Sequence, residues 1–180
     1  NIYLDYLDGV WSKLCADLGV LVRYCDDFVV LCKTEKACRE AERRVRKLLA
    51  ELKLELHPDK TKRVDLGWGK QGIDFLGCHL RKRFSGPVWE KERKRVYFLQ
   101  RWPSTKSMKR IKQRVKDLTH RSRSHVDPRV LIAELNPVLR GWGQYLGTGN
   151  ASDKFSEVDK YVVWRMMRLR DCTPLRVLST

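Results

Sequence analysis

Two short apolar runs flank a pair of adjacent carboxylates near the start of the chain, and this pattern constrains the local fold most. Both runs, residues 19–23 and 28–32, are rich in β-branched and aliphatic residues, which favour strands. Tyr-Cys-Asp-Asp stands between them at residues 24–27, so the pattern predicts a tight hairpin with a two-residue acidic turn. Asp favours turns on its own account. An exposed pair such as Asp26 and Asp27 also suits Mg²⁺, which takes one or two carboxylates together with waters and phosphates.

The elements around this hairpin are expected to form an α+β unit. Apolar residues at three- and four-residue spacing predict an amphipathic helix over residues 2–18 that packs on an apolar surface. Thr34 followed by Glu35 is an N-cap signal for a second helix, which is expected to run to about residue 53. Short strands are expected, in chain order, over residues 54–56, 62–64 and 73–80, with a turn-rich tip at residues 67–72.

Basic charge is concentrated in the second part of the chain. The 180 residues carry 38 Lys and Arg against 22 Asp and Glu, a formal net charge of +16. Residues 1–75 hold 14 basic and 13 acidic side chains, and residues 76–180 hold 24 and 9. A solvated face does not need this asymmetry, whereas a domain that binds a polyanion does. The second part is therefore expected to bind nucleic acid in a salt-sensitive way.

This basic part is predicted to hold a linker and a helical domain. Residues 81–103, interrupted by two Pro residues, are expected to be an irregular basic linker. A helix capped by Ser104 or Ser107 follows, and a second helix starts at Asp127-Pro128. Pro137 should kink or divide that second helix, and a third helix begins at about residue 152.

Several motifs in colinear order resemble one family of enzymes. Tyr24-Cys25-Asp26-Asp27 resembles the Tyr-x-Asp-Asp box of reverse transcriptases, with Cys25 where the family usually carries Ala. Cys is a small hydrophobe, so Cys25 is expected to fit a buried strand. The surrounding chain is similar to the group II intron-encoded type, which combines a reverse transcriptase with a maturase. The other matching segments are Asn1–Asp8, His57–Thr61, Phe75–Gly77, Leu139–Trp142 and Phe155-Ser156.

The resemblance implies a division of the chain into three parts. Residues 1–80 would be the C-terminal half of a polymerase palm, built from helices and antiparallel hairpins. Residues 81–103 would link it to a small all-α helical thumb or maturase domain at residues 104–180. The chain begins without Met at Asn1, and it is therefore expected to be a fragment of a longer protein.

The resemblance also implies a catalytic site. Asp26 would be a ligand of Mg²⁺, with Mn²⁺ as the alternative ion, and Asp27 would shape the site or contact metal at longer range. Lys60 would approach the phosphates of the incoming nucleotide, although a Lys after a Pro-Asp turn is equally a solvated loop residue. A further catalytic Asp of the family would lie upstream of Asn1, so this chain alone is expected to be inactive.

Nucleic-acid contacts are implied in two places. Phe75, Leu76 and Gly77 resemble the primer grip, where Gly permits close backbone approach, although a Gly at a β-bulge needs no function. The aromatic residues of the helical part are expected to be core rather than stacking platforms. Arginine suits bidentate phosphate contacts. The candidates to bind RNA are Arg110, Arg114, Arg121, Arg123, Arg165, Arg168 and Arg170.

The expected function is that of an RNA-directed DNA polymerase that also assists intron splicing. Its partners would be intron RNA, an RNA template, a DNA primer and deoxynucleoside triphosphates. No apolar run is long enough to span a membrane, and the resemblance implies a cytoplasmic ribonucleoprotein of a bacterial host. Two alternatives stay open: an RNA-binding splicing maturase without polymerase activity, and a reverse transcriptase of the same lineage in another system, such as CRISPR adaptation.

Overall fold

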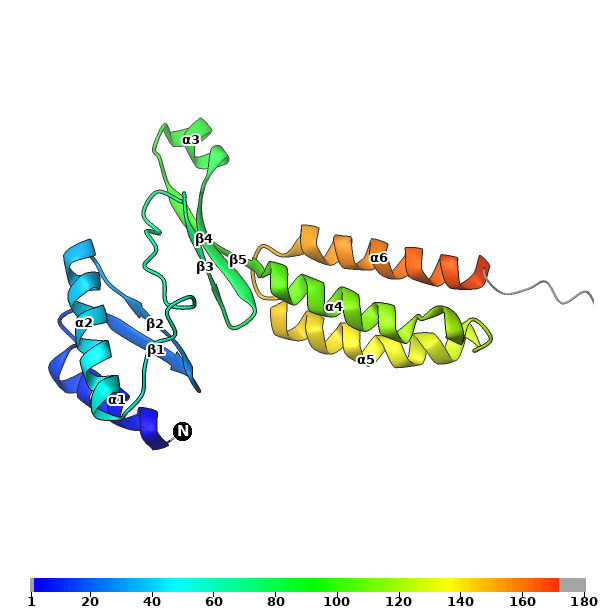
Figure 1. Cartoon of the computed structure of the whole chain (residues 1–180). Coiled ribbons are helices and arrows are strands. Elements are labelled where there is room, and N and C mark those ends of the chain that lie inside the picture. The colour runs from blue at the N-terminus through cyan, green and yellow to red at the C-terminus, as the bar shows by residue number, and fades with distance from the viewer. Residues whose placement is uncertain (1, 172–180) are drawn as a thin grey trace, which may run out of the picture. The chain divides into compact units, whose positions relative to one another are not determined.

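The computed structural model describes residues 2–171, and the chain divides into two compact units, Asn1–Val64 and Asp65–Thr180. Helices and antiparallel strands occur together, which confirms the predicted α+β class (Figure 1). The elements of the first unit are α1 (Ile2–Leu14), β1 (Val20–Tyr24), β2 (Asp27–Leu31) and α2 (Glu35–Glu51). β1 and β2 form the predicted hairpin, and α1 and α2 provide most of the buried core of the unit.

The core of the first unit lies between its two helices. Leu4, Leu7 and Trp11 of α1 are buried, with Leu7 wholly inaccessible to solvent. The buried face of the first helix is narrower than its apolar pattern predicts, and it consists of Leu4, Leu7, Trp11 and, just after the helix, Cys15. Ile2 and Leu14, which were expected to pack on this surface, are exposed. The residues of α2 that complete the core are Ala41, Val45, Leu48 and Leu49.

Local capping fixes the start of α2 where the sequence predicts it. The backbone N–H of Ala37 donates to Oγ1 of Thr34 at 3.1 Å, so Thr34 is the N-cap. The strands expected over residues 54–56 and 62–64 are absent, since both segments have no regular secondary structure. Neither segment belongs to one of the two sheets, and alternating apolar residues alone do not form a sheet.

The second unit begins with a three-stranded antiparallel sheet in the order β3-β4-β5. β3 (Gly72–Phe75) and β4 (Cys78–Phe84) form a hairpin whose two turn residues are Leu76 and Gly77. Their φ angles are +49° and +77°, the pattern of a type I′ turn. Residues 67–70 form a turn and a bend, in agreement with the predicted turn-rich tip at residues 67–72. The single strand predicted over residues 73–80 is wrong, because the turn at Leu76 and Gly77 divides it into β3 and the start of β4.

Residues 81–103 are ordered secondary structure rather than the irregular linker predicted. They contain the end of β4, the helix α3 (Gly86–Glu92) and the strand β5 (Tyr97–Pro103). Ser85 caps α3, and Pro87 stands in its first turn, a signal present in the sequence. β5 then pairs with β4 over seven residues. Basic composition hid the β propensity of the aromatic residues in β5.

Three helices lie side by side in the rest of the unit: α4 (Thr105–Leu118), α5 (Pro128–Leu146) and α6 (Ser152–Asp171) (Figure 1). Ser104 rather than Ser107 caps α4, since its Oγ accepts from the N–H of Ser107. A short 3-10 turn, Arg121–Arg123, connects α4 to α5. α5 runs through Pro137 undivided, because Pro137 lies on its exposed side, where water can satisfy the freed carbonyl. The buried apolar residues are Met108, Ile111, Val115, Leu131, Leu135, Leu146, Ala151, Val158 and Leu169.

Candidate active site

The acidic tip of the β1–β2 hairpin is a two-residue turn, as predicted, but its position is shifted by one residue. Tyr24 pairs with Asp27, so the two turn residues are Cys25 and Asp26, and Asp27 is the first residue of β2. The prediction of an Asp-Asp turn is therefore wrong by one residue. Cys25 is exposed and has a φ of +54°, so it does not lie in a buried strand as expected. A non-glycine residue in this conformation is uncommon and marks a constrained turn.

Both carboxylates of the tip are available to a ligand. Asp26 and Asp27 are exposed, and neither forms a hydrogen bond or ion pair with another residue of the described part. Two such oxygens suit Mg²⁺, which completes its shell with waters and substrate phosphates. Within residues 2–171, no group of three or more acidic, His or Cys side chains is placed to hold a metal ion. The tip fits a site of one or two protein carboxylates and does not form a closed cage.

One arginine holds this turn against α1. Arg23 forms an ion pair with Asp8, and its Nε lies 3.0 Å from both carboxylate oxygens. Its Nη1 also donates to the carbonyl of Cys25 at 2.7 Å. The hydrogen bonds that Arg23 donates to Asp8 lower the pKa of the Asp8 carboxyl, whereas desolvation raises it by a smaller amount. Sequence reasoning missed Arg23, because Asp8 is 15 residues away and the pairing depends on how α1 packs.

Lys60 lies in the same compact unit as the acidic tip. It is exposed, and its backbone N–H donates to the carbonyl of His57 at 3.2 Å within a turn. The side chain has no hydrogen bond or ion pair in the described part of the chain, so it can reach an anion. Its predicted role at the nucleotide phosphates stays a prediction, since no contact joins Lys60 to Asp26.

The predicted primer-grip residues lie in the second unit, at the β3–β4 turn. The hydroxyl of Tyr145 on α5 donates to the carbonyl of Leu76 at 3.1 Å. The backbone N–H of Ser104 donates to the carbonyl of Gly77 at 2.9 Å. The carbonyl of Leu76 is therefore held by α5, and the carbonyl of Gly77 is held by the N-cap residue of α4. Phe75 ends β3 and is half-buried.

The predicted RNA-binding arginines fall into two groups. Arg123 forms a two-fold hydrogen-bonded pair with Glu134 at 2.7 and 2.8 Å. Arg165 donates through Nε to Oγ1 of Thr119 at 2.9 Å, and through Nη2 to the carbonyl of Lys116 at 3.3 Å. Arg123 and Arg165 therefore connect helices. The other five predicted arginines are exposed and have no ion pair within residues 2–171: Arg110, Arg114, Arg121, Arg168 and Arg170. Arg168 lies over the Trp164 ring, 5.0 Å from its centroid.

Two known families match this chain in colinear order. Residues 1–80 match the family described as reverse transcriptase (RNA-dependent DNA polymerase). Residues 108–172 match the family described as group II intron, maturase-specific domain. The chain belongs to the group II intron reverse transcriptase and maturase family. No curated protein matches the chain.

The family membership is consistent with nucleic-acid partners and with the exposed basic arginines. The match leaves residues 81–107 and 173–180 outside both families. The first of these segments contains α3 and β5, which join the β3–β4 hairpin to the helical bundle. In the described part of this family member, no helix is long and apolar enough to cross a bilayer.

Proposed function

We propose that the chain is part of an RNA-directed DNA polymerase that copies RNA into DNA and assists the splicing of its intron. The observation that carries this proposal is the exposed Asp26-Asp27 tip, in a chain that belongs to the reverse transcriptase family. The tip is constrained by the Cys25 backbone and by Arg23, and neither carboxylate has a partner among the described residues. Asp alone favours such a turn, so the family membership is what supports a catalytic role for the pair.

The residues of the first unit have distinct roles in this proposal. Asp26 holds a Mg²⁺ ion, and Asp27 shapes the site from the start of β2. When bound, Mg²⁺ stabilises the negative charge that develops on the attacking 3′ oxygen and on the phosphates of the nucleotide. Arg23 keeps the turn in place through Asp8 and the Cys25 carbonyl. Lys60 contacts the phosphates of the incoming deoxynucleoside triphosphate.

The second unit binds nucleic acid in this proposal. The β3–β4 turn at Phe75–Gly77 holds the primer end, positioned by Tyr145 and Ser104. The exposed arginines of the helical bundle bind intron or template RNA through its phosphates, which suits recognition of RNA by shape and backbone. We propose residues 1–80 as palm and 104–180 as thumb, with 81–103 as a structured connection between them. Cytoplasmic location as a ribonucleoprotein follows from these partners.

A further carboxylate is needed for full activity. Two carboxylates at the tip leave room for a third protein ligand, and residues 2–171 do not supply one in a suitable cluster. We therefore expect the 180-residue chain alone to bind RNA and not to extend a primer. The complete reverse transcriptase that carries this chain would supply the third carboxylate.

The test is primer extension on an RNA template by that complete enzyme. Extension should require Mg²⁺, stop when the ion is chelated, and resume when Mg²⁺ or Mn²⁺ is returned. Failure to extend under any of these ions, with RNA binding retained, would favour the splicing maturase without polymerase activity. A splicing assay with the precursor RNA separates the remaining alternative, because a reverse transcriptase of CRISPR adaptation would extend primers and leave splicing unchanged.

A further inference from the structure

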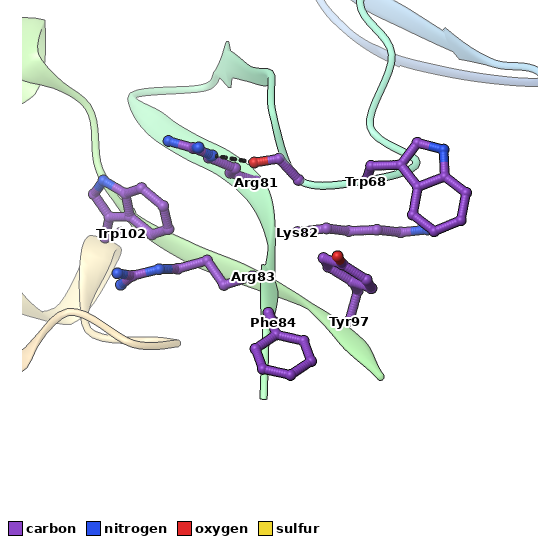
Figure 2. Close-up of a pocket in the computed structure, with 8 residues that line it drawn as sticks. Trp68, Arg81, Lys82, Arg83, Phe84, Tyr97 and Trp102 are labelled. Carbon is purple, nitrogen blue, oxygen red and sulfur yellow. Dashed lines mark hydrogen bonds between the residues drawn. The ribbon is translucent and has the colours of Figure 1, made fainter. Parts of the chain in front are cut away.

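A pocket of about 570 Å³ lies in the second unit, where β4 extends beyond the end of β3. β3 pairs with β4 only up to the contact between Gly72 and Arg81. Lys82, Arg83 and Phe84 therefore have β5 on one side and no strand on the other. The loop before β3 approaches this edge at Lys82 without pairing as a strand. Four aromatic and three cationic side chains line the pocket, and no carboxylate does (Figure 2).

The loop before β3 is built to hold Trp68 over this pocket. Gly69 has a φ of +67°, and a Cβ at this position would lie 2.3 Å from the carbonyl oxygen of Lys82. Only glycine allows that approach. Nε of Arg81 donates to the carbonyl of Gly69 at 2.8 Å, which fixes the loop to β4. The position of Trp68 is therefore set by the close approach of Gly69 to β4 and by the hydrogen bond from Arg81 to Gly69.

Trp68 offers an open aromatic face. Its ring meets Tyr97 edge to face, with the centroids 6.1 Å apart and the planes at 86°. The residue is nevertheless 69% exposed. Figure 2 shows the side chains of Trp68, Lys82 and Tyr97 on the same side of the pocket. The Trp68 ring is therefore both fixed in position and accessible to a ligand.

The cations of the pocket are available as well. Arg81, Lys82 and Arg83 have no carboxylate within ion-pair distance in the described part of the chain. The guanidinium of Arg83 lies 5.9 Å from the centroid of the Trp102 ring. Aromatic rings beside unpaired cations are the combination that binds single-stranded nucleic acid, through base stacking and phosphate contacts. An extended peptide could pair with the β4 edge, but three cations and no carboxylate favour a polyanion.

We propose that this pocket binds an unpaired strand of nucleic acid, with one base stacked on Trp68 and the backbone phosphates beside Lys82 and Arg83. The site lies at the opposite end of β4 from the Leu76-Gly77 turn, and it is distinct from the arginines of the helical bundle. It deepens the proposed function, on which it rests, by adding a contact for single strands. Bases of any sequence can stack there, since every base has a π-face.

The test measures binding of the full chain to a labelled 12-nucleotide single strand, as RNA and as DNA, over a series of salt concentrations. Trp68→Ala should weaken binding of the single strand by about tenfold, the effect expected for one stacked base. Trp68→Phe should restore most of the affinity, because it keeps a ring. Lys82→Gln should lower the salt slope by about 0.7, the value for one phosphate contact on a single strand. Phe98→Ala is the matched control, an exposed aromatic residue of the same sheet that does not line the pocket.

Each outcome bears on the site. Equal loss for RNA and DNA strands assigns the pocket to any unpaired strand, and a larger loss for RNA assigns it to intron or template RNA. Unchanged affinity in Trp68→Ala would overturn the proposal and leave the β4 edge as a site for an extended peptide. Duplex RNA that competes as well as the single strand would overturn it too. In both of these cases salt-sensitive binding of structured RNA would persist if the proposed function is right, and its absence would contradict that function separately.

Discussion

Arg165 on α6 forms hydrogen bonds at the C-terminal end of α4, and these contacts predict a measurable loss of stability when its guanidinium is removed. Thr119 ends α4 and is 1% exposed. The last carbonyls of a helix have no partner within it. The guanidinium of Arg165, from α6, donates to Oγ1 and the carbonyl of Thr119 and to the carbonyl of Lys116. Arg165→Met should therefore destabilise the helical bundle, since it removes the donors and keeps a long apolar stem.

The magnitude follows from the number of hydrogen bonds and their partial exposure. A hydrogen bond to a charged group contributes about 1.5–3 kcal/mol, and the Lys116 carbonyl, whose bond is exposed, recovers part of the loss by binding water. The buried Thr119 hydroxyl keeps its own bond to Val115, so the net loss should be about 2 kcal/mol. For a unit slightly above 100 residues, that loss lowers Tm by roughly 8 °C.

The assay pairs calorimetric unfolding of the full chain with RNA binding across salt concentrations. Arg110→Met is the matched control, because Arg110 is exposed on α4 and has no ion pair among the described residues. The control should leave Tm nearly unchanged and reduce the salt slope by about 0.7–0.9. Arg165→Met should do the reverse at a temperature where it is folded. An unchanged Tm with a reduced slope for Arg165→Met would refute this reasoning and return Arg165 to the RNA surface.

Two other predictions concern the first unit and the primer grip. Hydrogen bonds from Arg43 and Arg44 lower the pKa of Glu40 to about 2 from 4.5, so its contribution to stability is present above pH 4.5 and is lost as pH falls towards 2. As the pH is lowered over that range, the Tm of Glu40→Gln should therefore fall less steeply than the Tm of the wild type. An equally steep fall in both proteins would contradict the pairing of Glu40 with the two arginines. Tyr145→Phe removes the hydroxyl that donates to the Leu76 carbonyl. The lost hydrogen bond contributes about 0.5–1.5 kcal/mol, so the KM for primer should rise several-fold while RNA affinity stays unchanged. An unchanged KM would mean that the turn holds its position without this bond.

The parts of the fold that the sequence predicts are those set by local signals. The β1–β2 hairpin follows from two β-branched runs, and Thr34 marks the start of α2 through its own hydroxyl. The helices of the bundle follow from their apolar spacing and from Ser104 and Asp127 as caps. In each case the residues that decide the element are neighbours in the chain.

The parts that the sequence does not predict depend on distant contacts. The register of the acidic turn differs by one residue because Tyr24 pairs with Asp27, which allows Cys25 a left-handed conformation. Arg23 finds Asp8 only once α1 has packed beside the hairpin. β5 was missed although its aromatic residues favour a strand, because its partner β4 lies beyond an intervening helix. Such pairings are visible only after the chain has folded.

The same distinction applies to the candidate site. Asp26 and Asp27 could be selected from their position between two strands. Their lack of protein partners within residues 2–171 is a structural fact that the sequence does not contain. The internal roles of Arg123 and Arg165 likewise depend on helix packing. The sequence of a basic segment does not distinguish an arginine that connects helices from one that stays exposed.

The most direct test of the account is the effect of Asp26→Ala on primer extension and on RNA binding, measured on the same preparation of the complete enzyme. Glu55→Ala is the control, because Glu55 is an exposed acidic residue of the same unit without a partner among residues 2–171. The account predicts that Asp26→Ala abolishes extension with Mg²⁺ and keeps RNA affinity within about twofold, while Glu55→Ala retains both. Extension that survives in Asp26→Ala, or RNA binding that is lost together with it, would contradict the assignment of this tip as the polymerase metal site.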